Sequence, residues 1–123
     1  MKKYLAVTSI QAIVKQPQSS IREEILNLDI PDNIKKRLIE SLISGKVRLH
    51  HCKITSNILN KIIPLLSTLN ISPLILGHNT IGDDGALALA SALKINLTLT
   101  ELNLYGNDIR DDGTIALAGA LKT

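Results

Sequence analysis

Apolar and polar positions alternate in the same way in two stretches of the chain, residues 71–81 and 99–109. Both follow the pattern L-x-x-L-x-L-x-x-N-x-I, with Ile in the first place of the first stretch. Such alternation over a few residues predicts a short strand, with Leu102 and Leu104 pointing inward. Each stretch is followed by Asp-Asp-Gly and an Ala/Leu-rich run with helical spacing. We expect the Asp residues to cap that helix and complement its dipole.

These two stretches belong to a longer internal repeat. Residues 71–95 and 99–123 align at an offset of 28, with 13 of 25 positions identical. Asn79 and Asn107 recur where each predicted strand ends, and an Asn side chain has the donors and the acceptor to satisfy free backbone groups there. Small Ala residues recur in both predicted helices and would let them approach closely. The repeat therefore predicts stacked strand–helix units.

A third, degenerate copy precedes these two. Its apolar positions lie 27 residues before those of the second copy, and Cys52 takes the place of Asn. The following residues 56–67 have apolar side chains at helical spacing, although Pro64 lies among them and can kink or shorten a helix. The degenerate copy has its pattern positions at Val47, Leu49, Cys52 and Ile54.

The repeated residues resemble the leucine-rich-repeat family, and the unit N-x-I-G-D-D-G-A-x-A-L-A-x-A-L is similar to its ribonuclease-inhibitor-like subclass. The resemblance covers residues 47–123, in units of about 47–70, 71–98 and 99–123. It implies an α/β solenoid with parallel strands on a concave face, helices on the convex face, and recognition of protein partners by variable strand residues. Members of the subclass serve as inhibitors, adaptors and effectors that bacterial pathogens deliver into host cells, and the Lys/Ile/Asn-rich usage looks most like an effector.

Residues 1–46 lack the repeat, and a solenoid needs a cap on its first unit, so we expect a helical N-terminal cap here. Ser20 and Glu23 form a capping box for a helix over about 21–28. Asp32 is expected to cap a second helix, 33–44, which Gly45 ends. Its apolar face is predicted to comprise Ile34, Leu38, Leu42 and Ile43, and residues 4–14 suggest a further helix.

The last predicted helix runs directly into Leu121-Lys122-Thr123, with no segment of different composition to cover it. An open sheet edge near residues 99–104 is a pairing hazard. Two interpretations stand: the chain is a fragment of a longer repeat protein, or this uncapped end serves self-association or a partner.

The strand pattern predicts which side chains face out on the concave surface. Equivalent positions in neighbouring strands form ladders, such as His50, Gly77 and Tyr105, or Lys46, Pro73 and Glu101. Tyr105 is the best single anchor, because an exposed aromatic ring offers much contact area at little entropic cost. The predicted partner-binding residues are Lys46, Arg48, His50, His51, Ile75, His78, Glu101, Asn103 and Tyr105, with Pro73, Gly77 and Gly106 between them.

Charge adds an alternative to protein binding. Residues 1–61 carry a net charge of +6 and residues 62–123 one of −3, so the basic half could bind nucleic acid or an anionic surface. Aromatic residues make up only 2% of the chain, so an aromatic stacking platform is missing. A single cysteine forbids an intrachain disulfide and fits the cytoplasm or a host cytosol. No run of about twenty apolar residues predicts a membrane span.

Metal binding and catalysis are the remaining hypotheses. His51 and His78 occupy equivalent positions and could share a zinc ion, but Cys52 is expected to point into the turn, and zinc sites normally use three or four protein ligands. The acidic pairs recur in register, which favours capping over a catalytic constellation. We therefore expect no cofactor and no enzymatic activity, with a metal-dependent enzyme as the less favoured alternative.

Overall fold

The computed structural model of the chain describes residues 21–95 and 99–121. Helices alternate with short strands, as the repeat predicts, and residues 21–27 form a helix ahead of them. The labelled elements are α2 (Asp32–Ser44), β1 (Val47–Arg48), α3 (Ser56–Leu66), β2 (Leu74–Ile75), α4 (Gly82–Leu93), β3 (Leu102–Asn103) and α5 (Asp111–Leu121).

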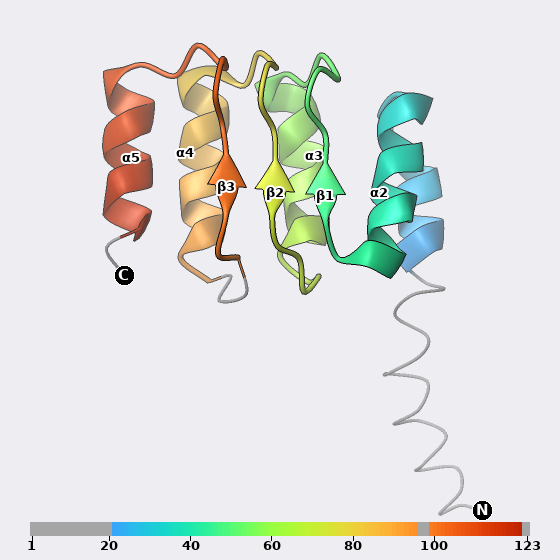
Figure 1. The fold of residues 1–123 in the computed structure, drawn as a ribbon. Helices are drawn as coiled ribbons and strands as arrows, with labels where there is room; N and C mark the ends of the chain where they lie inside the picture. Colours follow the sequence, from blue (N-terminus) through green and yellow to red (C-terminus); the bar gives the residue numbers. More distant parts are fainter. Residues whose placement is uncertain (1–20, 96–98, 122–123) are drawn as a thin grey trace, which may run out of the picture.

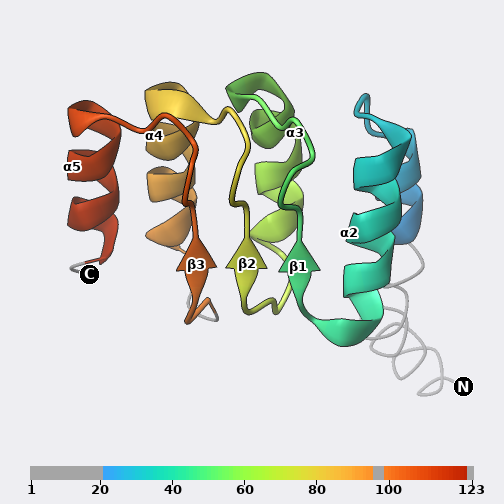
Figure 2. The same cartoon turned by 45° about the horizontal axis from the view of Figure 1, so that its top comes forward.

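The three strands form one parallel sheet in the order β1-β2-β3. Val47 pairs with Leu74, and Leu74 with Leu102, which confirms the predicted offsets of 27 and 28 residues. Helices α3, α4 and α5 stand in a row on one side of this sheet (Figures 1 and 2). The other side carries no helix of the described residues, and we call it the open sheet face. This arrangement agrees with the expected α/β architecture of parallel strands and helices.

The apolar core lies between the sheet and the helix row. The inward strand residues are completely or almost completely buried in the first two units, and so are the apolar residues that follow each turn. The core continues into the N-terminal helices without interruption. Its most buried members are Ile25, Ile34, Leu38, Val47, Leu49, Ile54, Leu59, Ile62, Leu74, Leu76 and Ile81.

The N-terminal helices follow the prediction with two corrections. Asp32 does not cap α2 but is its first residue, because Pro31 takes the N-cap position and makes no side-chain cap bond. Ile43 is 92% exposed, since it lies beyond the face on which Ile34 and Leu38 are buried. Gly45 ends the helix as predicted, in the left-handed conformation with φ 75°. The helix expected over residues 4–14 and the Ser20 capping box lie outside the described residues.

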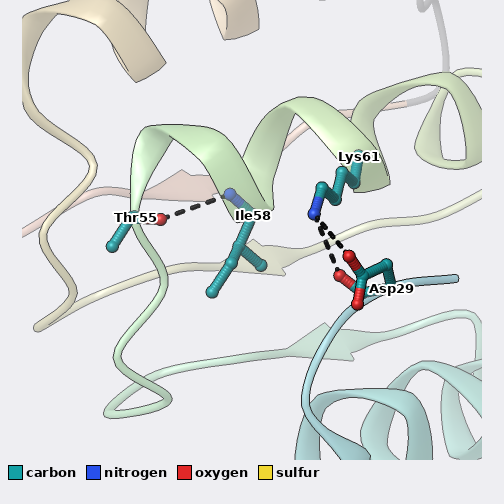
Figure 3. Close-up of polar contacts among 4 residues, drawn as sticks. All are labelled: Asp29, Thr55, Ile58 and Lys61. Carbon is teal, nitrogen blue, oxygen red and sulfur yellow. Dashed lines mark hydrogen bonds and ion pairs between the residues drawn. The ribbon is translucent and has the colours of Figure 1, made fainter.

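Helix α3 continues through Pro64 and ends two residues later, at Leu66. The predicted kink is therefore replaced by a short extension, which is compatible with a proline in a last turn. At the other end, Thr55 caps the helix by accepting a hydrogen bond from the Ile58 N–H at 3.3 Å (Figure 3). Lys61 on the same helix donates to Asp29, which ties α3 to the segment before α2 (Figure 3). None of the described helices is long and apolar enough to span a membrane.

Candidate functional site

The loops at the carboxyl ends of the strands are positioned by a buried asparagine in each of the last two units. The Asn79 side chain is 5% exposed and donates to the carbonyls of Leu49, Leu76 and Gly77, at 3.0, 2.8 and 3.3 Å. Its Oδ1 accepts from the N–H groups of Cys52 and Ile54, both at 3.0 Å. The predicted role is confirmed, and it extends further: the side chain satisfies the preceding turn as well as its own.

Asn107 repeats this arrangement one unit later. It donates to the carbonyls of Leu76, Leu104 and Tyr105, and accepts from the Ile81 N–H at 3.3 Å. Cys52, which stands in the Asn position of the first unit, is buried with its Sγ 3.4 Å from the His50 carbonyl. Its thiol therefore points into the turn, as expected. Burial raises the pKa of the Cys52 thiol, and the positive charge of Arg37 partly opposes that rise.

The acidic pairs require a correction. Ile81 is the N-cap of α4 and makes no side-chain cap bond, so Asp83 does not cap its own helix. Instead, Asp83 Oδ1 accepts from the N–H groups of Arg110 and Gly113, at 2.7 and 3.1 Å, where α5 begins. An Asp of one unit thus caps the helix of the next. Periodicity alone could not distinguish these two roles, because both recur with the same spacing.

The open sheet face carries the predicted binding residues in the predicted ladders. Arg48, Ile75 and Asn103 are register partners across the three strands. The sheet bonds from the Val47 and Leu74 N–H groups reach the carbonyls of Pro73 and Glu101, which places Lys46, Pro73 and Glu101 in a second ladder. Lys46, Arg48, His51, His78, Glu101, Asn103 and Tyr105 are exposed, and His50, Pro73 and Ile75 are partly buried.

Three rings form an aromatic row at the carboxyl ends of the strands, which we call the ring row: His51, His78 and Tyr105. The His51 and His78 rings are stacked with centroids 4.4 Å apart and planes 6° from parallel. Tyr105 meets His78 edge to face, with centroids 5.3 Å apart. His51 and His78 both have positive φ, 56° and 58°, so this unusual backbone conformation aims both imidazoles in the same direction.

His50 contributes a polar atom that the fold leaves unsatisfied. Its Nδ1 is buried and finds no hydrogen-bond partner among the described residues. The His50 ring lies edge to face against His51, with centroids 5.8 Å apart. In the described ranges, no three His, Cys, Asp or Glu residues gather as metal ligands would. The histidine cluster therefore presents rings and polar nitrogens at the margin of the open sheet face.

Two residues that shape the site were not recognised from the sequence as doing so. Gly106 has φ 71°, and a β-carbon there would lie 3.0 Å from the His78 Nδ1, so only glycine allows this close approach to the ring. Arg37 of α2 donates to the Arg48 carbonyl at 3.2 Å. Arg37 also lines, with Glu40, Ser44, Lys46 and Arg48, a shallow pocket of about 290 Å³ beside β1. A basic residue on a helix gives no signal of a contact eleven residues away.

A parallel sheet built from strand–turn–helix units, with an asparagine in each turn and variable residues on the open face, defines the class of protein-interaction repeats. The sequence comparison is more specific: the family described as Leucine Rich repeat matches residues 73–90 and 96–118. These segments are leucine-rich repeats, and such repeats generally mediate protein–protein interaction. Comparison with curated proteins and with solved structures gives no match.

Proposed function

We propose that the chain is a short repeat solenoid of the ribonuclease-inhibitor-like kind that binds a partner protein through the open sheet face. The observation that carries this proposal is the ring row, which ends in Tyr105 with 73% of its surface exposed. Stacking already restricts the His78 ring, so binding there would cost little side-chain entropy. Aromatic anchors of this kind supply a large share of the energy in protein interfaces.

Charge along the face describes the partner. Lys46 and Arg48 make the β1 side basic, while Glu101 on the β3 side is acidic. Between them, Pro73 and Ile75 form a partly buried apolar strip. A complementary partner therefore presents an acidic patch toward β1, an apolar centre, and a donor-rich edge toward β3 and Tyr105. Three short strands offer less than the roughly 800 Å² per partner of a standard interface, so the epitope is small.

A reducing compartment suits this role. The single cysteine is buried with a raised thiol pKa, which makes it a poor site for oxidation. We place the protein in the cytoplasm or, as an effector of a bacterial pathogen, in a host cytosol. Leucine-rich repeats are typically interaction modules without enzymatic activity, and we propose the same for this chain.

The test is affinity capture from bacterial and host lysates, comparing the wild type with the double variant Tyr105→Ala, Arg48→Glu. The matched control is Leu87→Ala, Lys36→Glu, which makes similar changes at exposed positions on the helix side. We expect the site variant to lose a protein that the wild type and the control both capture. Equal capture by all three would refute the open sheet face. Capture that disappears with nuclease and falls steeply with salt would instead support the nucleic-acid alternative.

A further inference from the structure

The outer side of β3 and α5 is a sheet edge and helix face that no described residue covers. One unit earlier, the same face is buried: Ala86 and Ala90 of α4 are 0% and 4% exposed because α5 packs on that helix. Their repeat equivalents on α5, Thr114 and Ala118, are exposed, and so is Leu121 at 70%. Beside them lies a pocket of about 350 Å³ lined by Leu93, Leu99, Thr100, Glu101, Leu102, Leu104, Leu117 and Leu121.

The hydrogen-bonding groups of this edge follow from the preceding unit. On β2, the N–H groups of Leu74 and Leu76 donate to the Glu101 and Asn103 carbonyls of β3, at 2.9 and 2.8 Å. The equivalent groups on β3 belong to Leu102 and Leu104, and by the same register they point away from β2. Within one strand residue, the N–H and C=O point to the same side. The open edge therefore presents two donors and two acceptors, at positions two residues apart.

We propose that a second copy of this chain covers this face, with the two β3 strands antiparallel about a two-fold axis at Asn103. Leu102 then lies opposite Leu104 of the second copy, and Leu104 opposite Leu102 of the second copy. Each pair exchanges two hydrogen bonds, so all four outward N–H groups of the two strands find a carbonyl. The edge is thus complementary to itself, as a two-fold interface requires.

Charge supports the antiparallel orientation. Helix α5 begins with Asp111 and Asp112 at one end of this face, and Lys94 lies at the other end, where α4 finishes. The two-fold axis brings each acidic end toward the basic end of the second copy. It also sets the α5 dipoles antiparallel, which is favourable. The apolar lining of the pocket then packs against the same residues of the other copy.

A head-to-tail contact between copies is less favourable. It would need the outer edge of β1, but α2 packs there, and Arg37 already donates to the Arg48 carbonyl. Both copies would also have to meet with different surfaces, which produces open chains unless a ring closes. The two-fold pairing has neither problem, and it joins two three-stranded sheets into one of six strands.

The first test is the oligomeric state of the full chain, measured by sedimentation velocity over a range of concentrations. Ala118→Arg places a long cation on the proposed interface at an exposed position, so the fold should tolerate it. Gly119→Arg is the matched control, because a side chain there meets nothing within 4 Å and its equivalent Ser91 stays exposed beside α5. We expect a dimer for the wild type and the control, and at least about tenfold weaker association for Ala118→Arg, or about 1.4 kcal/mol.

The second test concerns register. In the proposed pairing, Asn103 faces itself across a pair without hydrogen bonds, at a Cα separation of about 4.5 Å that a disulfide can span. In a Cys52→Ser background, Asn103→Cys should form a covalent dimer on mild oxidation with diamide. Glu101→Cys should not, since its opposite residue would be Tyr105 of the second copy.

A wild type that is monomeric at every accessible concentration would overturn the proposal. So would a dimer that survives Ala118→Arg and does not cross-link through position 103. Circular dichroism of each variant confirms that it is folded. Ala118 lies off the open sheet face, so these results are independent of the proposed partner binding.

Discussion

The second and third units have 13 of 25 residues in common, yet they are packed very differently. In the second unit, the inward strand residues Leu74 and Leu76 and the helix residue Leu89 are at most 2% exposed. Their counterparts Leu102, Leu104 and Leu117 in the third unit are only partly buried. The same amino acids in the same local structure therefore have different energetic weight, because burial depends on the neighbouring unit. The comparison predicts unequal effects for equal substitutions.

The largest difference is expected for the core leucines. Leu76→Ala removes a side chain that is completely buried, and should lower the free energy of unfolding by about 3–4 kcal/mol. Leu104→Ala, at the equivalent half-buried position, should cost about half as much. Urea denaturation at a protein concentration low enough to keep the chain monomeric measures both. Equal losses would show that the third unit is as well packed as the second.

The two asparagines should differ next. Asn79→Ala removes a side chain that makes five hydrogen bonds to two turns, and the buried backbone groups it leaves should cost about 2–3 kcal/mol. Asn107→Ala removes four, nearer the exposed end, and should cost about 1–2 kcal/mol. Hydrogen exchange of the Cys52 and Ile54 amides provides a local check: only Asn79→Ala should accelerate it. Acceleration of these amides by Asn107→Ala would argue against local action.

Two glycines of α5 should respond with opposite signs. A β-carbon on Gly113 would lie 2.6 Å from Asp83 Oδ1 and 2.9 Å from the Ala86 β-carbon, so Gly113→Ala should destabilise the protein by about 1–2 kcal/mol. Gly119 has open space around it, and Gly119→Ala should stabilise the helix by about 0.5–1 kcal/mol. Thermal unfolding of the two variants compares the signs directly. Stabilisation by both would mean that α4 and α5 are farther apart than described.

The smallest contrast concerns the aspartates. Asp83→Ala removes the cap of α5 and should cost about 1 kcal/mol. Asp111→Ala changes the equivalent residue, but no helix follows α5 among the described residues, so the effect on the monomer should stay within about 0.5 kcal/mol. The Arg110 and Gly113 amides should exchange faster in Asp83→Ala alone. If Asp111→Ala costs as much as Asp83→Ala, the capping role belongs to each helix's own aspartate.

Much of the fold could be predicted from the sequence, because the spacing of the repeat determines register directly. An offset of 28 between identical residues aligned Leu74 with Leu102, and the structure pairs exactly these two. The outward positions of the ladders then followed from strand alternation. Gly45 was a reliable helix end, since few other residues adopt positive φ there.

What could not be predicted is contact between units that the pattern treats alike. A recurring Asp before a helix is equally consistent with capping its own helix and capping the next one, and only the backbone path places Asp83 beside Arg110. Stacking of His51 on His78 likewise depends on two positive φ values that non-glycine residues rarely adopt. Ile43 was misplaced because helical spacing alone could not locate the limit of the buried face.

The forward reach of Asp83 and the backward reach of Asn107 affect how such an array can change in length. Each unit carries one side chain that serves its successor and one that serves its predecessor. Duplication or deletion of a whole 28-residue segment therefore moves both connections together, and every new junction receives the same pair of contacts. A segment cut at any other length would leave helix amides or turn carbonyls without partners, so growth by whole units is the route that this architecture tolerates.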